Sequence, residues 1–148
     1  MRLSTRGHYG LKAIYDLALH YGEGPVPISE IARRQMISEP YLEQLFSVLR
    51  KAGLIKSVRG AQGGYLLNRL PEEITVGEIV RVLEGPIAPV ECVSENVKEA
   101  CDQADACISR VVWAKVRDAL NKVLDSITLK DMIEEAKKNQ NQNLMYYI

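Results

Sequence analysis

The chain has 148 residues, of which 47% are hydrophobic, and it carries 19 basic and 19 acidic side chains. This length and hydrophobic content support a globular protein with a real core. The sequence contains no apolar run of about 18 residues, and the start "MRLSTRGHYG" lacks the apolar core of a signal peptide, which argues against a membrane or secreted protein. We therefore expect a cytoplasmic protein with no membrane partner.

The zero net charge conceals an asymmetry between the two halves of the chain. Residues 1–70 carry 10 Lys and Arg against 5 Asp and Glu, whereas residues 71–148 carry 9 against 14. A basic first half suits a polyanion such as DNA, while an acidic second half would be repelled by phosphates. The charge pattern predicts DNA contacts in the first half only.

The first half predicts a helix-turn-helix. Apolar residues recur at helical spacing between the N-cap candidate Ser4 and the terminating Gly22, which predicts a first helix. Two further helices, "ISEIARRQMI" and "SEPYLEQLFSVLRKAG", are joined by a short turn, with Ser38 as N-cap and Pro40 in the first turn of the second. The polar face of that second helix is free to contact a partner, and it carries Tyr41, Glu43, Gln44, Ser47, Arg50 and Lys51.

A basic hairpin follows the helix-turn-helix directly. The segments "LIKSV" and "YLLNR" predict two short strands, and the glycines of "RGAQGG" permit a tight hairpin between them. A helix-turn-helix with such a hairpin is a winged helix. We expect its second helix in a major groove about 12 Å wide and Arg59 in a minor groove. The alternative is an all-helical interaction domain.

The second half predicts a loop between helices. "TVGEIVRVLEG" begins with a capping box of Thr75 and Glu78 and ends at Gly85. Irregular sequence with two prolines follows before a long helix starts at Cys107. The expected organisation is a winged-helix DNA-binding domain (1–85), a cysteine-bearing loop (86–106), dimerisation helices (107–138) and a flexible tail (139–148).

The long helix carries an apolar stripe that one winged helix cannot cover. A short helix after Thr128 adds more apolar side chains, and the tail is polar and expected to be mobile. A two-fold homodimer on the long helix would bury the stripe and pair two winged heads, whereas intramolecular packing is the alternative. The stripe consists of Val111, Val112, Trp113, Val116, Ala119, Leu120, Val123, Leu124 and Ile127.

All three cysteines, Cys92, Cys101 and Cys107, lie close together in the sequence. A reducing compartment and an odd number of thiols make a disulfide framework a poor explanation. Soft thiolates bind iron-sulfur clusters or zinc, and such ligands often share a loop. The spacing therefore indicates a metal site or a redox sensor, with three incidental thiols as the alternative.

Four stretches carry a family resemblance: "MRLSTRGHYGLKA", "YLEQLFSVLRKAGLIKSVRGAQGGYLL", "ITVGEIV" and the spaced cysteines before an aromatic-bearing long helix. They resemble the Rrf2 family of winged-helix regulators typified by the iron-sulfur cluster regulator IscR. The resemblance implies a homodimeric transcription factor that is not an enzyme and that senses iron-sulfur or redox status through a cluster, 2Fe-2S or 4Fe-4S. It places Cys92, Cys101 and Cys107 as cluster ligands.

The resemblance also bears on the fourth ligand. Relatives often have a histidine three residues after the last cysteine, but this chain has Arg110, which cannot ligate a metal. The remaining candidates are His8, His20, Asp102, Asp105 or an exogenous molecule. A metal-free regulator that senses thiol oxidation directly, and an iron-sulfur electron carrier, stay open as alternatives.

Two grounds support the predicted DNA contacts: the polar face of the second helix and the family resemblance. Pro40 replaces the small polar residue that some relatives carry, so the resemblance does not fix the preferred operator. The candidate DNA-binding residues on a double-stranded operator are Ser38, Tyr41, Glu43, Gln44, Arg50, Lys51, Lys56 and Arg59.

Overall fold

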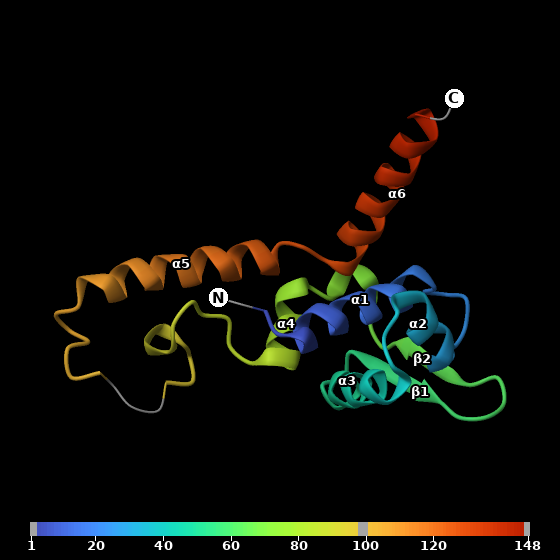
Figure 1. The fold of residues 1–148 in the computed structure, drawn as a ribbon, viewed down its shortest axis with the longest axis horizontal. Helices are drawn as coiled ribbons and strands as arrows, with labels where there is room; N and C mark the ends of the chain where they lie inside the picture. The colour runs from blue at the N-terminus through green and yellow to red at the C-terminus, as the bar shows by residue number, and fades with distance from the viewer. Residues whose placement is uncertain (1–2, 98–100, 147–148) are drawn as a thin grey trace.

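The computed structural model describes residues 3–97 and 101–146, and it is mainly helical with one two-stranded antiparallel sheet. The elements α1 to α4 and the sheet form a winged head, from which α5 and α6 extend in different directions (Figure 1). The helices are α1 (Thr5–Leu19), α2 (Ile28–Gln35), α3 (Glu39–Lys51), α4 (Val76–Glu84), α5 (Ile108–Asp125) and α6 (Leu129–Tyr146). The strands are β1 (Ile55–Val58) and β2 (Gly64–Leu67), and short 3-10 turns lie at Pro71–Glu73 and Glu91–Val93.

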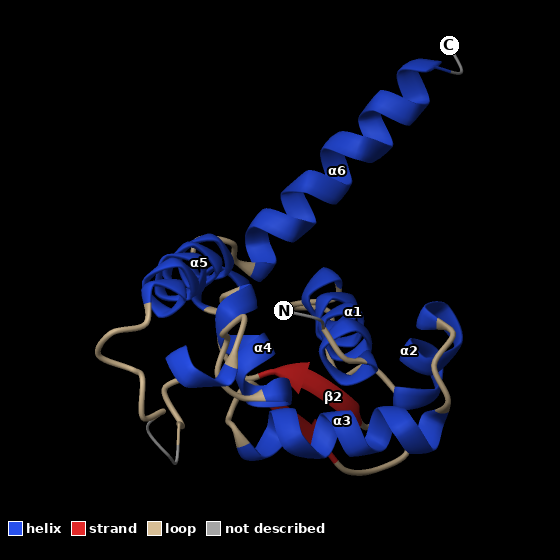
Figure 2. Cartoon of the chain, turned by 60° about the vertical axis from the view of Figure 1, so that its left-hand side comes forward, coloured by secondary structure: helices blue, strands red, loops and turns tan. Residues whose placement is uncertain are grey.

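The head has a single core that the apolar faces of its helices share. α3 contributes one buried residue every three or four positions, because that spacing repeats on one side of a helix. Phe46 of α3 meets Tyr65 of β2 edge-on with ring centroids 4.9 Å apart, which fixes the sheet against the helix. Figure 2 shows the sheet beside α3. The largest fully buried side chains include Ile14, Ile31, Leu42, Phe46, Leu49 and Leu54.

The predicted helix-turn-helix is confirmed. α2 ends at Met36, which has a left-handed backbone with φ of 57° and turns the chain sharply. Ser38 then caps α3, since its hydroxyl accepts a hydrogen bond from the Tyr41 N–H at 3.4 Å. Pro40 occupies the first turn of α3, where its missing N–H leaves no hydrogen bond unmade.

The predicted wing is confirmed as well. β1 and β2 pair antiparallel from Ile55 opposite Leu67 to Val58 opposite Gly64, so residues 59–63 form the hairpin tip. Tyr65 also exchanges two backbone hydrogen bonds of 2.9 Å with Val26, which precedes α2. This bridge holds the hairpin beside the helix-turn-helix, and the fold is therefore a winged helix as the sequence predicted.

α1 and α4 approach closely because α1 carries glycines on the facing side. A Cβ atom at Gly10 would lie 2.2 Å from Leu83 Cδ1, so only glycine allows this packing without movement. Ser4 lies at the N-cap position as predicted, but its hydroxyl does not cap the helix. The Glu84 carboxylate of α4 caps α1 instead, accepting from the Ser4 N–H at 2.6 Å and the Gly7 N–H at 3.2 Å.

The apolar stripe of α5 divides into two parts. Leu120, Leu124 and Ile127 pack against a buried cluster in their own chain, made by Val76, Val80 and Ile87. The prediction that these three residues belong to an uncovered stripe is therefore wrong, because they face α4. The rest of the stripe is exposed and lies on Val111, Val112, Trp113, Val116, Ala119 and Val123.

α6 is longer than the predicted short helix and includes most of the segment that was predicted as a flexible tail (139–148). Its helix runs from Leu129 to Tyr146, and Figure 1 shows it leaving the head. Polar Asn, Gln and Lys residues fill the segment, but no Gly or Pro interrupts the helix, so the backbone can continue. Residues 147–148 of the predicted tail lie outside the described residues.

Candidate functional site

The exposed side of α3 and the wing form one candidate interface. Glu43, Gln44 and Lys51 are exposed, whereas Tyr41 is half-buried. The Tyr41 hydroxyl lies 3.3 Å from Thr5 Oγ1 of α1, and its ring stands edge-on to Tyr9 with centroids 6.3 Å apart. These contacts fix the position of Tyr41 at the start of α3.

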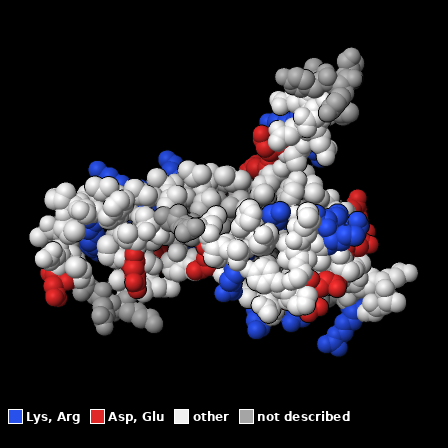
Figure 3. All heavy atoms as spheres, in the orientation of Figure 1, with Lys and Arg blue, Asp and Glu red and all other residues white. Residues whose placement is uncertain are grey.

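Basic side chains lie on α3 and on the hairpin, and one of them joins the two elements. Arg50 of α3 donates to the Ser57 hydroxyl of β1 at 3.5 Å, while Lys56 and Arg59 are exposed on the hairpin and its tip. Figure 3 shows Lys and Arg along the lower edge of the head, where Figure 1 places α3 and the hairpin. The structure thus leaves Glu43, Gln44, Arg50, Lys51 and Arg59 exposed on α3 and the adjoining hairpin, whereas Lys56 lies near the end of α1, in a cavity lined also by His20 and Tyr21.

A buried ion pair orients the helix-turn-helix on α1. The Asp16 carboxylate is 1% exposed and accepts from Arg34 Nη2 at 2.7 Å and Nε at 3.0 Å, and from Gln35 Nε2 at 3.0 Å. Burial acts to raise the pKa of Asp16, but the hydrogen bonds from Arg34 and Gln35 outweigh it and hold the pKa below its ordinary value. The ring of His20 lies 2.9 Å from the Asp16 carbonyl oxygen, so this candidate ligand has a structural contact.

The three cysteines lie on the irregular segment between α4 and α5. Cys92, in the 3-10 turn, and Cys107, directly before α5, are half-exposed, and Cys101 is exposed; all three are free thiols. Within residues 3–97 and 101–146, no three His, Cys, Asp or Glu side chains gather closely enough to hold a metal ion. The predicted ligand set is therefore on one loop but is not brought together.

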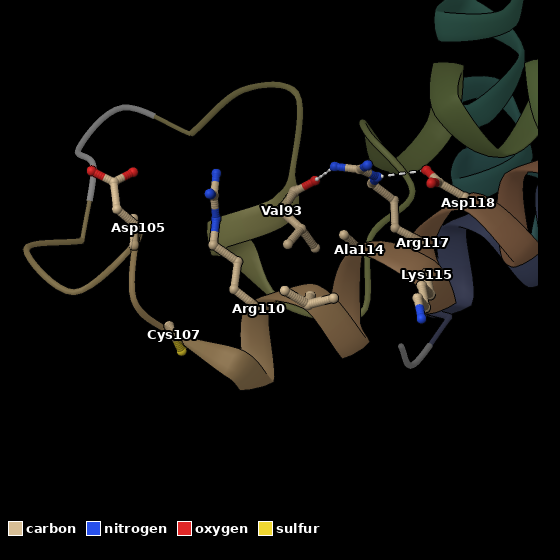
Figure 4. Close-up of a pocket in the computed structure, with 10 residues that line it drawn as sticks. Val93, Asp105, Cys107, Arg110, Ala114, Lys115, Arg117 and Asp118 are labelled. Carbon is tan, nitrogen blue, oxygen red and sulfur yellow. Dashed lines mark hydrogen bonds and ion pairs between the residues drawn. The ribbon is translucent and has the colours of Figure 1, made fainter.

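A cavity of about 550 Å³ separates this loop from α5. Figure 4 shows Arg110 extending from α5 between Asp105 and Val93, with Cys107 at the start of the helix. The two predicted carboxylate candidates, Asp102 and Asp105, are exposed on the loop, and His8 is exposed on α1. The donor chemistry suits a thiolate-bound cluster, because three free thiols remain accessible to solvent on an irregular segment.

Polar contacts connect the loop with the head through α5. Arg117 donates to the Val93 carbonyl oxygen at 3.0 Å, and Asn121 donates to the Ile87 carbonyl oxygen at 3.0 Å. Arg81 of α4 then binds Asn121 at 2.5 Å and both oxygens of Asp125 at 2.8 Å. The sequence did not predict these contacts, since no local pattern links Arg81 to a carboxylate 44 positions away.

The sequence matches the Rrf2 family model, described as an iron-dependent transcriptional regulator, over residues 3–135. The chain belongs to the Rrf2 family. This Rrf2-family chain is 48% identical over 148 residues to the HTH-type transcriptional regulator CymR of Bacillus subtilis, covering 100% of both. It is 43% identical over 133 residues to IscR of Sodalis glossinidius, covering 90% of this chain and 79% of that protein.

Solved structures of both kinds of relative have the same fold. The T. potens IscR structure gives a TM-score of 0.79 at 52% identity, covering 95% of this chain and 91% of that one. The structure of CymR, described as the global cysteine regulator of B. subtilis, gives a TM-score of 0.77 at 48% identity. This match covers 91% of this chain and 98% of that one. These relatives are transcriptional regulators, and so is this Rrf2-family chain, which is not an enzyme.

Throughout the described ranges of this Rrf2-family regulator, no helix is both long and apolar enough to cross a bilayer.

Proposed function

We propose that this protein is a homodimeric regulator that binds a specific double-stranded operator through α3 and the wing. The observation that carries this proposal is that Gln44 and Lys51 are exposed on α3, which Arg50 joins to the hairpin through Ser57, and that Arg59 is exposed at the hairpin tip. α3 suits a major groove, where Glu43 and Gln44 can meet base edges, and Arg59 at the hairpin tip suits a minor groove. Lys51 and Lys56 supply phosphate contacts, which position the protein without reading the sequence.

The homodimer is proposed from the uncovered part of α5. Val112, Val116 and Val123 are 49%, 36% and 57% exposed, respectively, and recur at spacings of four and seven residues on one side of the helix. A row of exposed aliphatic side chains is unfavourable in water, and a second copy of α5 would cover it. The resulting dimer would present two winged heads to a palindromic site.

The cysteine segment is proposed as the sensor. Cys92, Cys101 and Cys107 would hold an iron-sulfur cluster, and a fourth ligand would come from His8, His20, Asp102, Asp105 or a small molecule. When bound, the cluster supplies a redox-active centre that can be lost or modified under stress. The loop would order around these ligands, and the Arg117 contact with Val93 would carry that ordering to α5 and then, through Arg81, to α4.

A second sensing mode is supported by the placement of the thiols. All three cysteines are free thiols and at least partly exposed, which suits direct oxidation without a metal. In that mode, peroxide would oxidise one thiol to a sulfenic acid with release of water, and the sulfenic acid would condense with a second cysteine thiol to form a disulfide and a second water. A thiol reductant would reverse the change by reducing the disulfide.

Selection of bound duplexes from a random-sequence pool tests the DNA-binding proposal. We expect one palindromic sequence to be enriched, and we expect Gln44→Ala and Arg59→Ala each to weaken its binding by about 1–3 kcal/mol. Lys138→Ala, on the exposed surface of α6, serves as the control and should bind like the wild type. Selection without enrichment would contradict sequence-specific recognition, and an unchanged affinity of Arg59→Ala would contradict the role of the wing.

A further inference from the structure

A second cavity lies between the first turn of α1 and the recognition helix. Its volume is about 310 Å³, and Arg6, Tyr41, Gln44, Leu45 and Val48 line it. Arg6 is exposed, and in the described parts of the chain its guanidinium makes no ion pair or side-chain hydrogen bond. A full positive charge therefore borders this cavity without an acidic partner there.

Arg6 differs in this respect from the three arginines of the head that form ion pairs. Arg34 is bound to Asp16, Arg69 to Glu78 and Arg81 to Asp125. Those three pairs hold elements of the fold together, so each of these guanidinium groups is neutralised by a carboxylate of the same chain. The guanidinium of Arg6 is not neutralised in this way, and it can therefore bind an anion from outside the chain.

The backbone N–H groups that begin α1 cannot bind that anion. The Glu84 carboxylate already accepts from the Ser4 and Gly7 N–H groups and from the Ser4 hydroxyl. Its negative charge also opposes a second anion at the helix axis. An incoming anion must therefore be bound by the Arg6 side chain, which points to the cavity beside α3 rather than to the helix end.

The position of Arg6 around α3 indicates which anion it meets. At 100° per residue, Tyr41 and Val48 lie roughly 180° from Arg50 on the α3 surface, and the core-facing residues lie between them. Arg6 therefore flanks one side of α3, and Arg50 and the hairpin flank the other. A helix about 10–12 Å wide fills a major groove about 12 Å wide, so each flank faces a sugar-phosphate backbone.

We propose that Arg6 binds a phosphate of the DNA backbone in the cavity between α1 and α3. This inference rests on the proposed DNA-binding function and adds to it a contact from outside the winged-helix motif. Thr5 stabilises the arrangement, because its hydroxyl lies 3.3 Å from the Tyr41 hydroxyl and fixes the first turn of α1 beside α3. Cations then flank both sides of the recognition helix and determine its depth in the groove.

The test compares Arg6→Ala with wild type on the selected duplex and on an unrelated duplex of equal length, at several salt concentrations. A phosphate contact gives a loss on the order of ten-fold per protomer at about 0.1 M salt, equal for both duplexes, with a salt slope shallower by about one unit per protomer. Arg6→Lys should recover most of the affinity, since a point charge is enough for a phosphate. Lys138→Ala is the matched charge-removal control.

The other possible results distinguish a failure of the Arg6 inference from a failure of the proposed DNA-binding function. If Arg6→Ala binds like the wild type while Gln44→Ala and Arg59→Ala are weakened, the inference is overturned and the DNA-binding function stands. If Arg6→Ala loses affinity only for the selected duplex, with an unchanged salt slope, Arg6 acts on bases and the phosphate contact is wrong. If the wild type binds neither duplex, the proposed function itself fails. Thermal melting of each variant, with Arg6→Gln as a second neutral variant, separates unfolding from lost contact.

Discussion

At the scale of single residues, the head contains a buried carboxylate, Asp16, that is paired with Arg34. Replacing Asp16 by Asn removes a charged acceptor of three hydrogen bonds inside the core. We expect the free energy of unfolding at neutral pH to fall by about 1–3 kcal/mol, as measured by urea denaturation. Glu30→Gln is the control, because the exposed Glu30 carboxylate only approaches Arg34 at 3.4 Å and should contribute little.

The same residue gives a pH dependence with a defined sign. The pKa of Asp16 is lower in the folded protein than its ordinary value, so the carboxylate stabilises the fold above the unfolded pKa, near 4. That contribution is lost as the pH falls through the lowered pKa. We expect the wild type to lose stability below about pH 4, and Asp16→Asn to lose less over the same range. Identical pH profiles of the two proteins would contradict this role.

Local chemistry explains which single-residue predictions succeeded. The Ser38 cap and the placement of Pro40 depend on residues next to each other, so the sequence was sufficient. The cap of α1 was not predictable, because its acceptor, Glu84, is 80 residues from Ser4. The role of Arg6 was missed for the same reason, since its position beside Tyr41 is visible only in the folded chain.

At the scale of elements, the contact of α1 with α4 depends on Gly10. Gly10→Ala places a methyl group against the buried Leu83 side chain, which must move to accept it. We expect a loss of about 1–3 kcal/mol in the free energy of unfolding. Combining it with Leu83→Ala opens space at that position, so the double variant should lose less than the sum of the two single variants. Strict additivity would show that the two sites do not contact each other.

Some helix boundaries could be predicted from the sequence and others could not. The ends of α3 and α4 were predictable from capping residues and from Gly85. The length of α6 was not, because polar low-complexity sequence resembles a tail although it contains no helix breaker. The division of the α5 stripe was also hidden, since an apolar residue that contacts α4 and one that awaits a partner look the same in a sequence.

At the scale of the whole molecule, the two faces of α5 should respond differently to a buried charge. Val116→Asp places the charge on the uncovered face, so it should give folded monomers by analytical ultracentrifugation. Leu120→Asp places it against Val76 and Val80 of the same chain, so it should lower thermal stability instead. A folded dimer of Val116→Asp would contradict the proposed dimer interface.

The most direct test of the whole account is the affinity of the protein for the selected duplex, measured under anaerobic and reducing conditions. Three forms of the protein are compared: metal-loaded, metal-free, and a variant with Cys92, Cys101 and Cys107 all replaced by Ala. Because ligand binding should order the loop and act on the head through Arg117 and Arg81, we expect the loaded and metal-free proteins to differ in affinity. The triple-Ala variant should contain no iron and should bind like the metal-free protein. Equal affinities in all three states, for a protein that does bind iron, would contradict control of DNA binding by the cysteine loop.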